Sequence, residues 1–128
     1  MDTWSFQHLA QADLEALRRR RQALYRVWQE WTGRYGVSAV FPDLATGSMP
    51  LVYPGSTDSK AASAAWFRWG HRSGIDVHSW PTLPLSVVRE DGAAVRRWER
   101  TVCFPLHQAL SPQELESQLR RLRPAGLP

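Results

Sequence analysis

Two short, largely apolar runs, each ended by proline, constrain the fold of this chain more than any other feature. The first occupies residues 75–80 and is followed by Pro81, and the second occupies residues 101–106 and contains Pro105. Apolar runs of this length, bounded by glycine and proline, are typical of strands. The first run leads into a polar loop and the second into a helix, so we expect short strands connected by helices.

Apolar residues at spacings of three, four and seven predict a long amphipathic helix over residues 13–31. Its apolar positions are Leu14, Leu17, Leu24, Trp28 and Trp31. Asp13 is a suitable N-cap, and Gly33 with Gly36 supplies the stop. The run Arg18–Arg21 spans about 300° around this helix at roughly 100° per residue, so it cannot form one flat basic patch.

A second helix is expected in the middle of the chain. Ser56, Thr57 or Asp58 can cap it, its alanines favour helix, and it should continue to about Arg72. Gly74 then supplies the left-handed residue that ends it.

The last helix has the clearest local signal. Ser111 as N-cap, Pro112 at the first helical position and Glu114 two residues later form a capping box. Its buried side should consist of Leu115, Leu119 and Leu122. A shorter helix is expected over residues 92–98.

The strands are expected at residues 37–41, 50–53, 75–80 and 101–106. Pro42, Pro50 and Pro54 should bound strands or lie at a sheet edge, where a missing N–H is harmless. The order of elements predicts an α+β fold with a small, mostly antiparallel sheet, packed by the N-terminal, middle and C-terminal helices. Residues 1–123 are expected to form one domain, and 124–128 a loose tail.

The composition narrows the function classes. Arginine provides 15 of the 16 basic residues, and the net charge is +4. Arginine suits carboxylate or phosphate partners, but solvated helix faces or a GC-rich genome explain the same bias. Most of the seven tryptophans are expected in the core or at its rim. The single cysteine, Cys103, is expected to be a buried, inert thiol, and the absence of a leader or spanning segment predicts a cytoplasmic protein without membrane contact.

Three segments of the chain resemble one family. They are the Arg-rich helix that begins at Asp13, the step from Gly74-Ile75 to Trp80-Pro81, and residues 104–108 with Leu110 and Ser111. In this order they resemble the small C-terminal domain of the DegT/DnrJ family, whose members use pyridoxal phosphate to aminate nucleotide-linked keto sugars. The resemblance covers nearly the whole chain, but not the large domain that builds the cofactor site.

The resemblance implies a substrate-facing loop after residue 77. By that match His78, Trp80 and Arg89 are candidates to line a sugar-binding surface, although His78 also fits an ordinary strand-face histidine. The family requires a lysine for its cofactor, and Lys60, the only lysine, falls in the first turn of a surface helix. We therefore expect no catalytic or cofactor-binding residue in this chain. His107 should serve the turn before the last helix, and no histidine pair has metal-ligand spacing.

Three functions follow from these patterns. The first is a stand-alone small domain that does not catalyse alone and binds or completes a partner in polysaccharide or nucleotide-sugar biosynthesis. Its partner would be an aminotransferase large domain or a second copy, with a nucleotide sugar as ligand. The second is a protein interaction module that uses exposed tryptophan and arginine. The third is nucleic-acid binding, which the modest net charge of +4 supports least.

Overall fold

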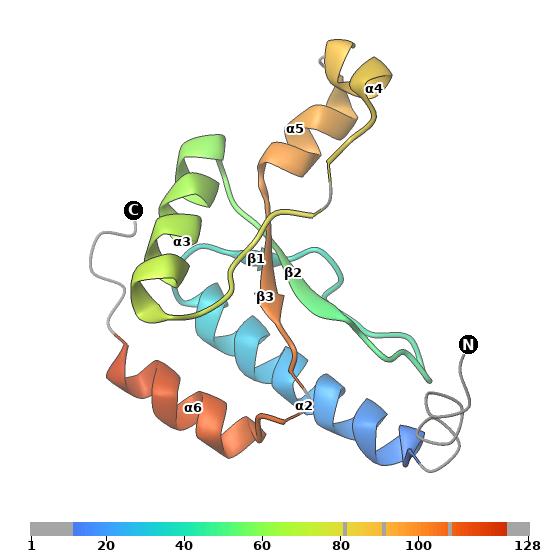
Figure 1. The fold of residues 1–128 in the computed structure, drawn as a ribbon, viewed down its shortest axis with the longest axis vertical. Coiled ribbons are helices and arrows are strands. Elements are labelled where there is room, and N and C mark those ends of the chain that lie inside the picture. Colours follow the sequence, from blue (N-terminus) through green and yellow to red (C-terminus); the bar gives the residue numbers. More distant parts are fainter. Residues whose placement is uncertain (1–11, 81, 91, 108, 123–128) are drawn as a thin grey trace, which may run out of the picture.

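A computed structural model describes residues 12–80, 82–90, 92–107 and 109–122 of the chain (Figure 1). Trp4 and the expected tail at 124–128 lie outside these residues. The helices and strands of the described residues are, in order, α2 (Leu14–Gly33), β1 (Ser38–Ala39), β2 (Val52–Ser56), α3 (Lys60–Ser73), α4 (Leu85–Arg89), α5 (Ala93–Glu99), β3 (Thr101–Pro105) and α6 (Pro112–Arg121). The predicted α+β class is confirmed.

The sheet has the strand order β1-β2-β3, and both pairings are antiparallel. Pro54 lies in the central strand β2 and pairs with Cys103, so the expectation that it would bound a strand or lie at an edge is wrong. The amide of Val40 donates to the Pro54 carbonyl at 3.0 Å. Carbonyl and nitrogen of one strand residue face the same side, so the missing donor faces the short strand β1 and the ladder with β3 stays intact.

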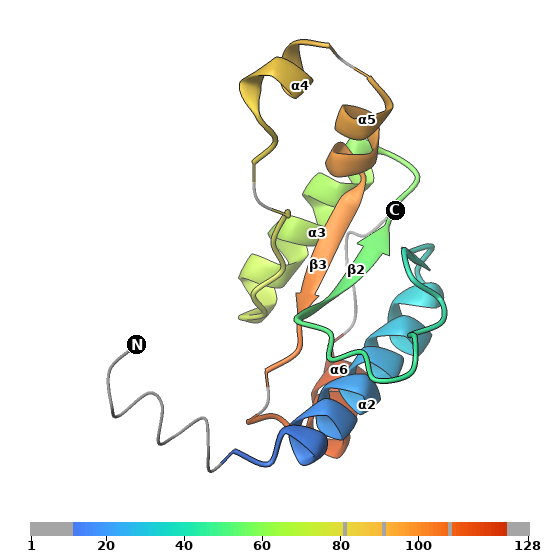
Figure 2. The same cartoon turned by 90° about the vertical axis from the view of Figure 1, so that its right-hand side faces the viewer.

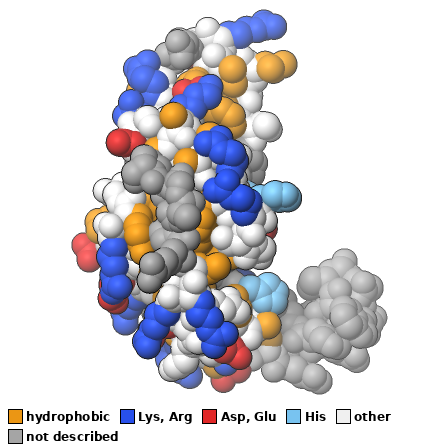
Figure 3. Space-filling model, turned by 90° about the vertical axis from the view of Figure 1, so that its left-hand side faces the viewer, with side chains coloured by type: hydrophobic (Ala, Val, Ile, Leu, Met, Phe, Trp, Pro, Cys, Tyr) orange, Lys and Arg blue, Asp and Glu red, His pale blue; other side chains and the backbone are white. Residues whose placement is uncertain are grey.

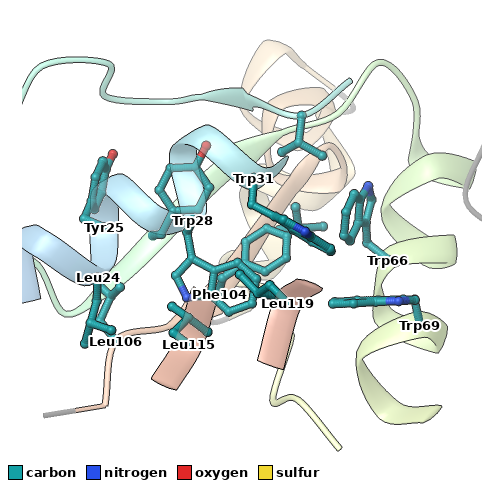
Figure 4. Packing of buried hydrophobic residues seen from close by; sticks show 13 residues of the cluster. Leu24, Tyr25, Trp28, Trp31, Trp66, Trp69, Phe104, Leu106, Leu115 and Leu119 are labelled. Atoms are coloured by element: carbon teal, nitrogen blue, oxygen red, sulfur yellow. The ribbon is translucent and has the colours of Figure 1, made fainter. Parts of the chain in front are cut away.

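The core lies between one face of this sheet and the helices α2, α3 and α6 (Figure 4). Phe104 of β3 has no exposed surface, and its ring centroid lies 4.8 Å from Trp28 and 5.4 Å from Trp66. The buried tryptophans are Trp28, Trp31, Trp66 and Trp69. The prediction that most tryptophans lie in the core or at its rim is therefore confirmed for the described ones.

The apolar seam of α2 is buried only in its second half. Leu24, Trp28 and Trp31 are buried, whereas Leu17 is half-buried and Leu14 is exposed. The first turns of α2 extend beyond the sheet (Figure 1).

Helix ends follow local side-chain chemistry. Asp13 caps α2 by accepting from the amide of Ala16 at 2.8 Å, and Ser111 and Glu114 form the predicted capping box. Gly74 ends α3 with a φ of 67°, as predicted. The cap of α3 is Ser59, however, and none of the three predicted residues, because Ser56 belongs to β2 and the Thr57 hydroxyl is held by Ser63 Oγ at 2.8 Å.

Residues 75–80 do not form the predicted strand. Only His78 pairs with β3, through reciprocal backbone hydrogen bonds to Cys103 of 3.1 and 2.8 Å. The segment is held against α3 instead. Ile75 donates to the carbonyl of Gly70 at 2.9 Å, and a Cβ on Gly70 would lie 2.6 Å from a methyl group of Val77. The apolar residues of this run therefore pack on a helix rather than along a ladder.

Helices α4 and α5 form an arm that projects from the sheet end (Figure 1). The short helix α5 agrees with the prediction, whereas α4 was not predicted. At the base of the arm, Lys60 Nζ of α3 lies 2.6 Å from Glu99 Oε1. Among the described residues, no helix has the length and apolarity that a membrane crossing requires.

Candidate binding groove on the open face of the sheet

The second face of the sheet carries no helix among the described elements. Val52 and Pro54 of β2 alternate with the core residues of that strand. Cys103 of β3 lies opposite Pro54 in register, and Thr101 lies two residues before it on the same face of β3. Figure 2 views the sheet from this side, with α3 behind the strands. These residues contribute to the floor of an open groove with a volume of about 1170 Å³.

The groove has two walls of different origin. One wall is the loop between β1 and β2, which contributes Phe41, Met49 and Leu51. The other consists of α5 and the segment before α4, with Trp80 and Trp98. Most of the lining is apolar, as expected for a site that buries apolar surface of a ligand or partner.

Several large apolar side chains of the walls face solvent. Leu51 is 65% exposed, Phe41 58%, Trp80 49% and Met49 44%. All four line the same groove, and a concentration of exposed apolar side chains is typical of an interaction site in a folded protein.

Hydrogen bonds to backbone carbonyls fix both walls. The Tyr25 hydroxyl donates to the Phe41 carbonyl at 2.7 Å, and burial next to Tyr53 raises the pKa of Tyr25 to about 12. The indole of Trp98 donates to the Trp80 carbonyl at 3.1 Å. The groove is therefore bounded by anchored backbone, and its shape does not depend on side-chain packing alone.

Cys103 lies in the floor and has no exposed surface. Burial raises the pKa of its thiol to about 11. The expected burial of this cysteine is confirmed. A thiol in this state is almost fully protonated at neutral pH and is a poor nucleophile.

A second, polar pocket of about 380 Å³ adjoins the groove on the other side of residues 43–45. Arg18, Arg26, Gln22 and Gln29 of α2 line it, together with Asp43. Arg18 donates to Glu15 Oε1 at 2.6 Å, but its buried Nε has no hydrogen-bond partner among the described residues. With two arginines and one carboxylate in its lining, this pocket favours an anionic group.

The three candidate residues are not brought together. Trp80 lines the groove, His78 does not, and Arg89 lies exposed at the end of α4. The His78 Nδ1 lies 3.2 Å from the Asp76 carbonyl oxygen and 3.7 Å from its carboxylate. His78 thus interacts locally.

The remaining residues that the sequence analysis considered for catalysis or metal binding lie outside the groove or interact locally. Lys60 is paired with Glu99 on the surface and is not part of the groove. The ring of His107 accepts from the amide of Ala109 at 3.2 Å, as expected for a residue that serves the turn. In the part of the chain that the structure describes, no cluster of three or more His, Cys, Asp and Glu could hold a metal ion.

The sequence patterns did not predict that the loop between β1 and β2 forms a wall of the groove. Residues 43–48 read as a polar insert, and the apolar positions on either side were assigned to strands. The signal available in the sequence was the segment Met49-Pro50-Leu51. Its two large apolar side chains lie at the end of a polar insert, where a strand end does not require them. Arg97 and Trp98 of the other wall belong to the predicted short helix, whose exposed face could not be assigned from its length alone.

No family model, curated protein or solved structure matches this chain. The function is therefore argued from the groove and the residues that build it.

Proposed function

We propose that this chain is a small domain of the sugar-aminotransferase type that does not catalyse alone and acts by binding a partner through the open face of its sheet. The groove is the observation that carries the proposal. A sheet with one face covered by helices and the other lined by exposed Leu51, Phe41 and Trp80 leaves apolar surface that another protein domain can bury. We place the pair in nucleotide-sugar or polysaccharide biosynthesis on the sequence resemblance.

The chemistry of the described residues supports a binding role. A pyridoxal enzyme of this type uses a lysine amine as nucleophile. Lys60 instead lies in an ion pair between α3 and α5, outside the groove. The thiol of Cys103 in the groove floor is protonated and covered.

Binding to a large domain tests the proposal directly. The purified chain is mixed with the separately expressed large domain of a sugar aminotransferase, and binding is measured by isothermal titration calorimetry. We expect a complex that Leu51→Asp weakens at least about tenfold, because the substitution places a charge on an apolar contact surface. Arg68→Glu on the exposed side of α3 is the matched surface control. No binding by the wild-type chain would overturn the proposal.

The expectation that the chain does not catalyse alone needs a separate test. Pyridoxal phosphate is added to the chain, and absorbance is followed at about 420 nm, where a lysine aldimine absorbs. We expect no such band. A band that disappears in Lys60→Ala would contradict the non-catalytic role.

An interaction module outside sugar metabolism is the second candidate. The same exposed groove favours it, although four tryptophans are buried and only Trp80 and the half-buried Trp98 remain at the described surface. Light scattering after size exclusion separates a module that self-associates from one that binds a different protein. A concentration-dependent dimer that Leu51→Asp dissociates would favour self-association over a heterologous large domain.

A further inference from the structure

We infer that the element which occupies the groove is an acidic amphipathic helix of about three turns, supplied by a partner protein. The inference rests on the proposed function, because it specifies which part of the partner fills the site. It follows from the size of the groove, the distribution of apolar and basic groups around it, and the topology of the sheet.

The volume fits a helix. A helix about 10 Å across rises 1.5 Å per residue, so roughly ten residues fill about 1200 Å³, and the groove measures about 1170 Å³. A helix at this position would cover the second face of the sheet and complete a three-layer arrangement. Strand addition is less suitable, because the outer strand β1 has only two residues.

The walls fit the apolar stripe of such a helix. Leu51 and Phe41 project from one side and Trp80 from the other, over a floor of Val52 and Pro54. On α5 the lining residues Ala93 and Ala94 are small, which leaves room for large partner side chains. An amphipathic helix binds such grooves through apolar residues at i, i+3, i+4 and i+7.

The charges favour carboxylates on the flanks of that helix. Arg97 lines the α5 end of the groove, and no described residue pairs with its guanidinium group. Across residues 43–45, Arg18 and Arg26 line the adjoining polar pocket, where Arg18 also pairs with Glu15. Asp43 is the one carboxylate that lines the groove among the described residues. Arg97 in the groove and the two arginines of the adjoining pocket outnumber this carboxylate and thus complement an acidic helix.

Two other occupants fit less well. A second copy would bring the same arginines against one another, which costs free energy at an interface. Nucleic acid requires cations along its path, but the floor is apolar. On the opposite side of the molecule, basic side chains stand in separate groups (Figure 3).

Three synthetic peptides test the inference. Each has fourteen residues in roughly four turns and the same leucine stripe, with flanking positions occupied by Glu, Gln or Lys. Binding to the full chain is measured by fluorescence anisotropy of labelled peptide. We expect the Glu peptide to bind about three- to tenfold more tightly than the Gln peptide, and the Lys peptide least.

Arg97→Glu should reverse this order, so that the Lys peptide binds better than the Glu peptide. Arg68→Glu, which makes the same charge change away from the groove, should leave the order unchanged, and Leu51→Asp should weaken all three peptides. A labelled oligothymidine and the oligomeric state of the chain are measured alongside. We expect no oligothymidine binding that competes with the Glu peptide and no groove-dependent dimer.

Each contrary result has a distinct meaning. Equal binding of the three peptides, or an order that Arg97→Glu leaves unchanged, overturns the acidic helix. Failure of all peptides overturns it too, while the proposed function stands if the large domain still binds and Leu51→Asp weakens that complex. Competition by oligothymidine, or a dimer dissociated by Leu51→Asp, assigns the groove to nucleic acid or a second copy and also overturns the inference.

Discussion

The two faces of the sheet are built from alternate residues of the same two strands, yet they differ in what covers them. On one face Tyr53, Val102 and Phe104 are buried under helices and touch a cluster of tryptophans. On the other, Pro54 and Cys103 form the floor of a groove whose described walls are the β1–β2 loop and the arm with the segment before it. The comparison separates two roles: the first face holds the fold together, and the second is available for a partner.

The largest expected effect is the difference in stability between truncating an apolar side chain on the covered face and truncating one in the groove. Phe104→Ala should lower the free energy of unfolding by about 3–5 kcal/mol, because it leaves a cavity between Trp28 and Trp66. Leu51→Ala, at a position 65% exposed, should change it by less than about 0.5 kcal/mol. Urea denaturation of both variants gives the two values. Similar losses would show that the groove side also carries the stability of the fold.

A smaller effect comes from the same substitution on each face. Val102→Thr places a hydroxyl in the covered core, where Val102 has no exposed surface, and should cost about 1–3 kcal/mol. Val52→Thr puts the same group on the half-buried groove face and should cost less than about 1 kcal/mol, since water can reach the hydroxyl. Thermal unfolding of the pair measures the difference. Equal costs would mean that the groove face is as dry as the core.

The covered face was largely predictable from sequence. Helix ends depend on a few neighbouring residues, so Asp13, Gly74 and the Ser111 capping box could be recognised locally. The spacing of Leu24, Trp28 and Trp31 likewise gave the buried side of α2. Such signals work because the interaction and the pattern lie within one or two turns of chain.

The open face was not predictable in the same way. Alternation in residues 75–80 suggested a strand, but Gly70 lets the run pack on α3, a contact that no local pattern contains. Helix α4 has no side-chain cap hydrogen bond and contains Val87 and Val88, which favour strand over helix. Of the candidate site residues, only Trp80 reaches the groove. The walls result from long-range packing, which sequence spacing does not encode.

Cys103 tests how closed the groove floor is. With a pKa of about 11 instead of the ordinary 9.0, the thiol has roughly 100-fold less thiolate at about pH 8. We expect a thiol reagent to label the native chain at least about 100-fold more slowly than the chain in urea, and labelling should accelerate as pH approaches the raised pKa. Rapid labelling at about pH 8 without unfolding would show that the floor is open to solvent.

The smallest effect concerns α6, which completes the helical cover of the core face. The Glu114 carboxylate accepts from the amide of Ser111 at 2.8 Å, and this hydrogen bond, with the Ser111 hydroxyl and nearby Arg20, lowers the pKa of Glu114 below 4.5. A carboxyl group with a lowered pKa in the folded state stabilises the fold above its unfolded pKa and loses that contribution as pH falls through the folded value. The wild type should therefore be more stable than Glu114→Gln near neutral pH. Their unfolding midpoints should converge as pH falls below 4.5, whereas a constant difference across that range would mean that the carboxylate charge contributes nothing to holding α6 over the core face.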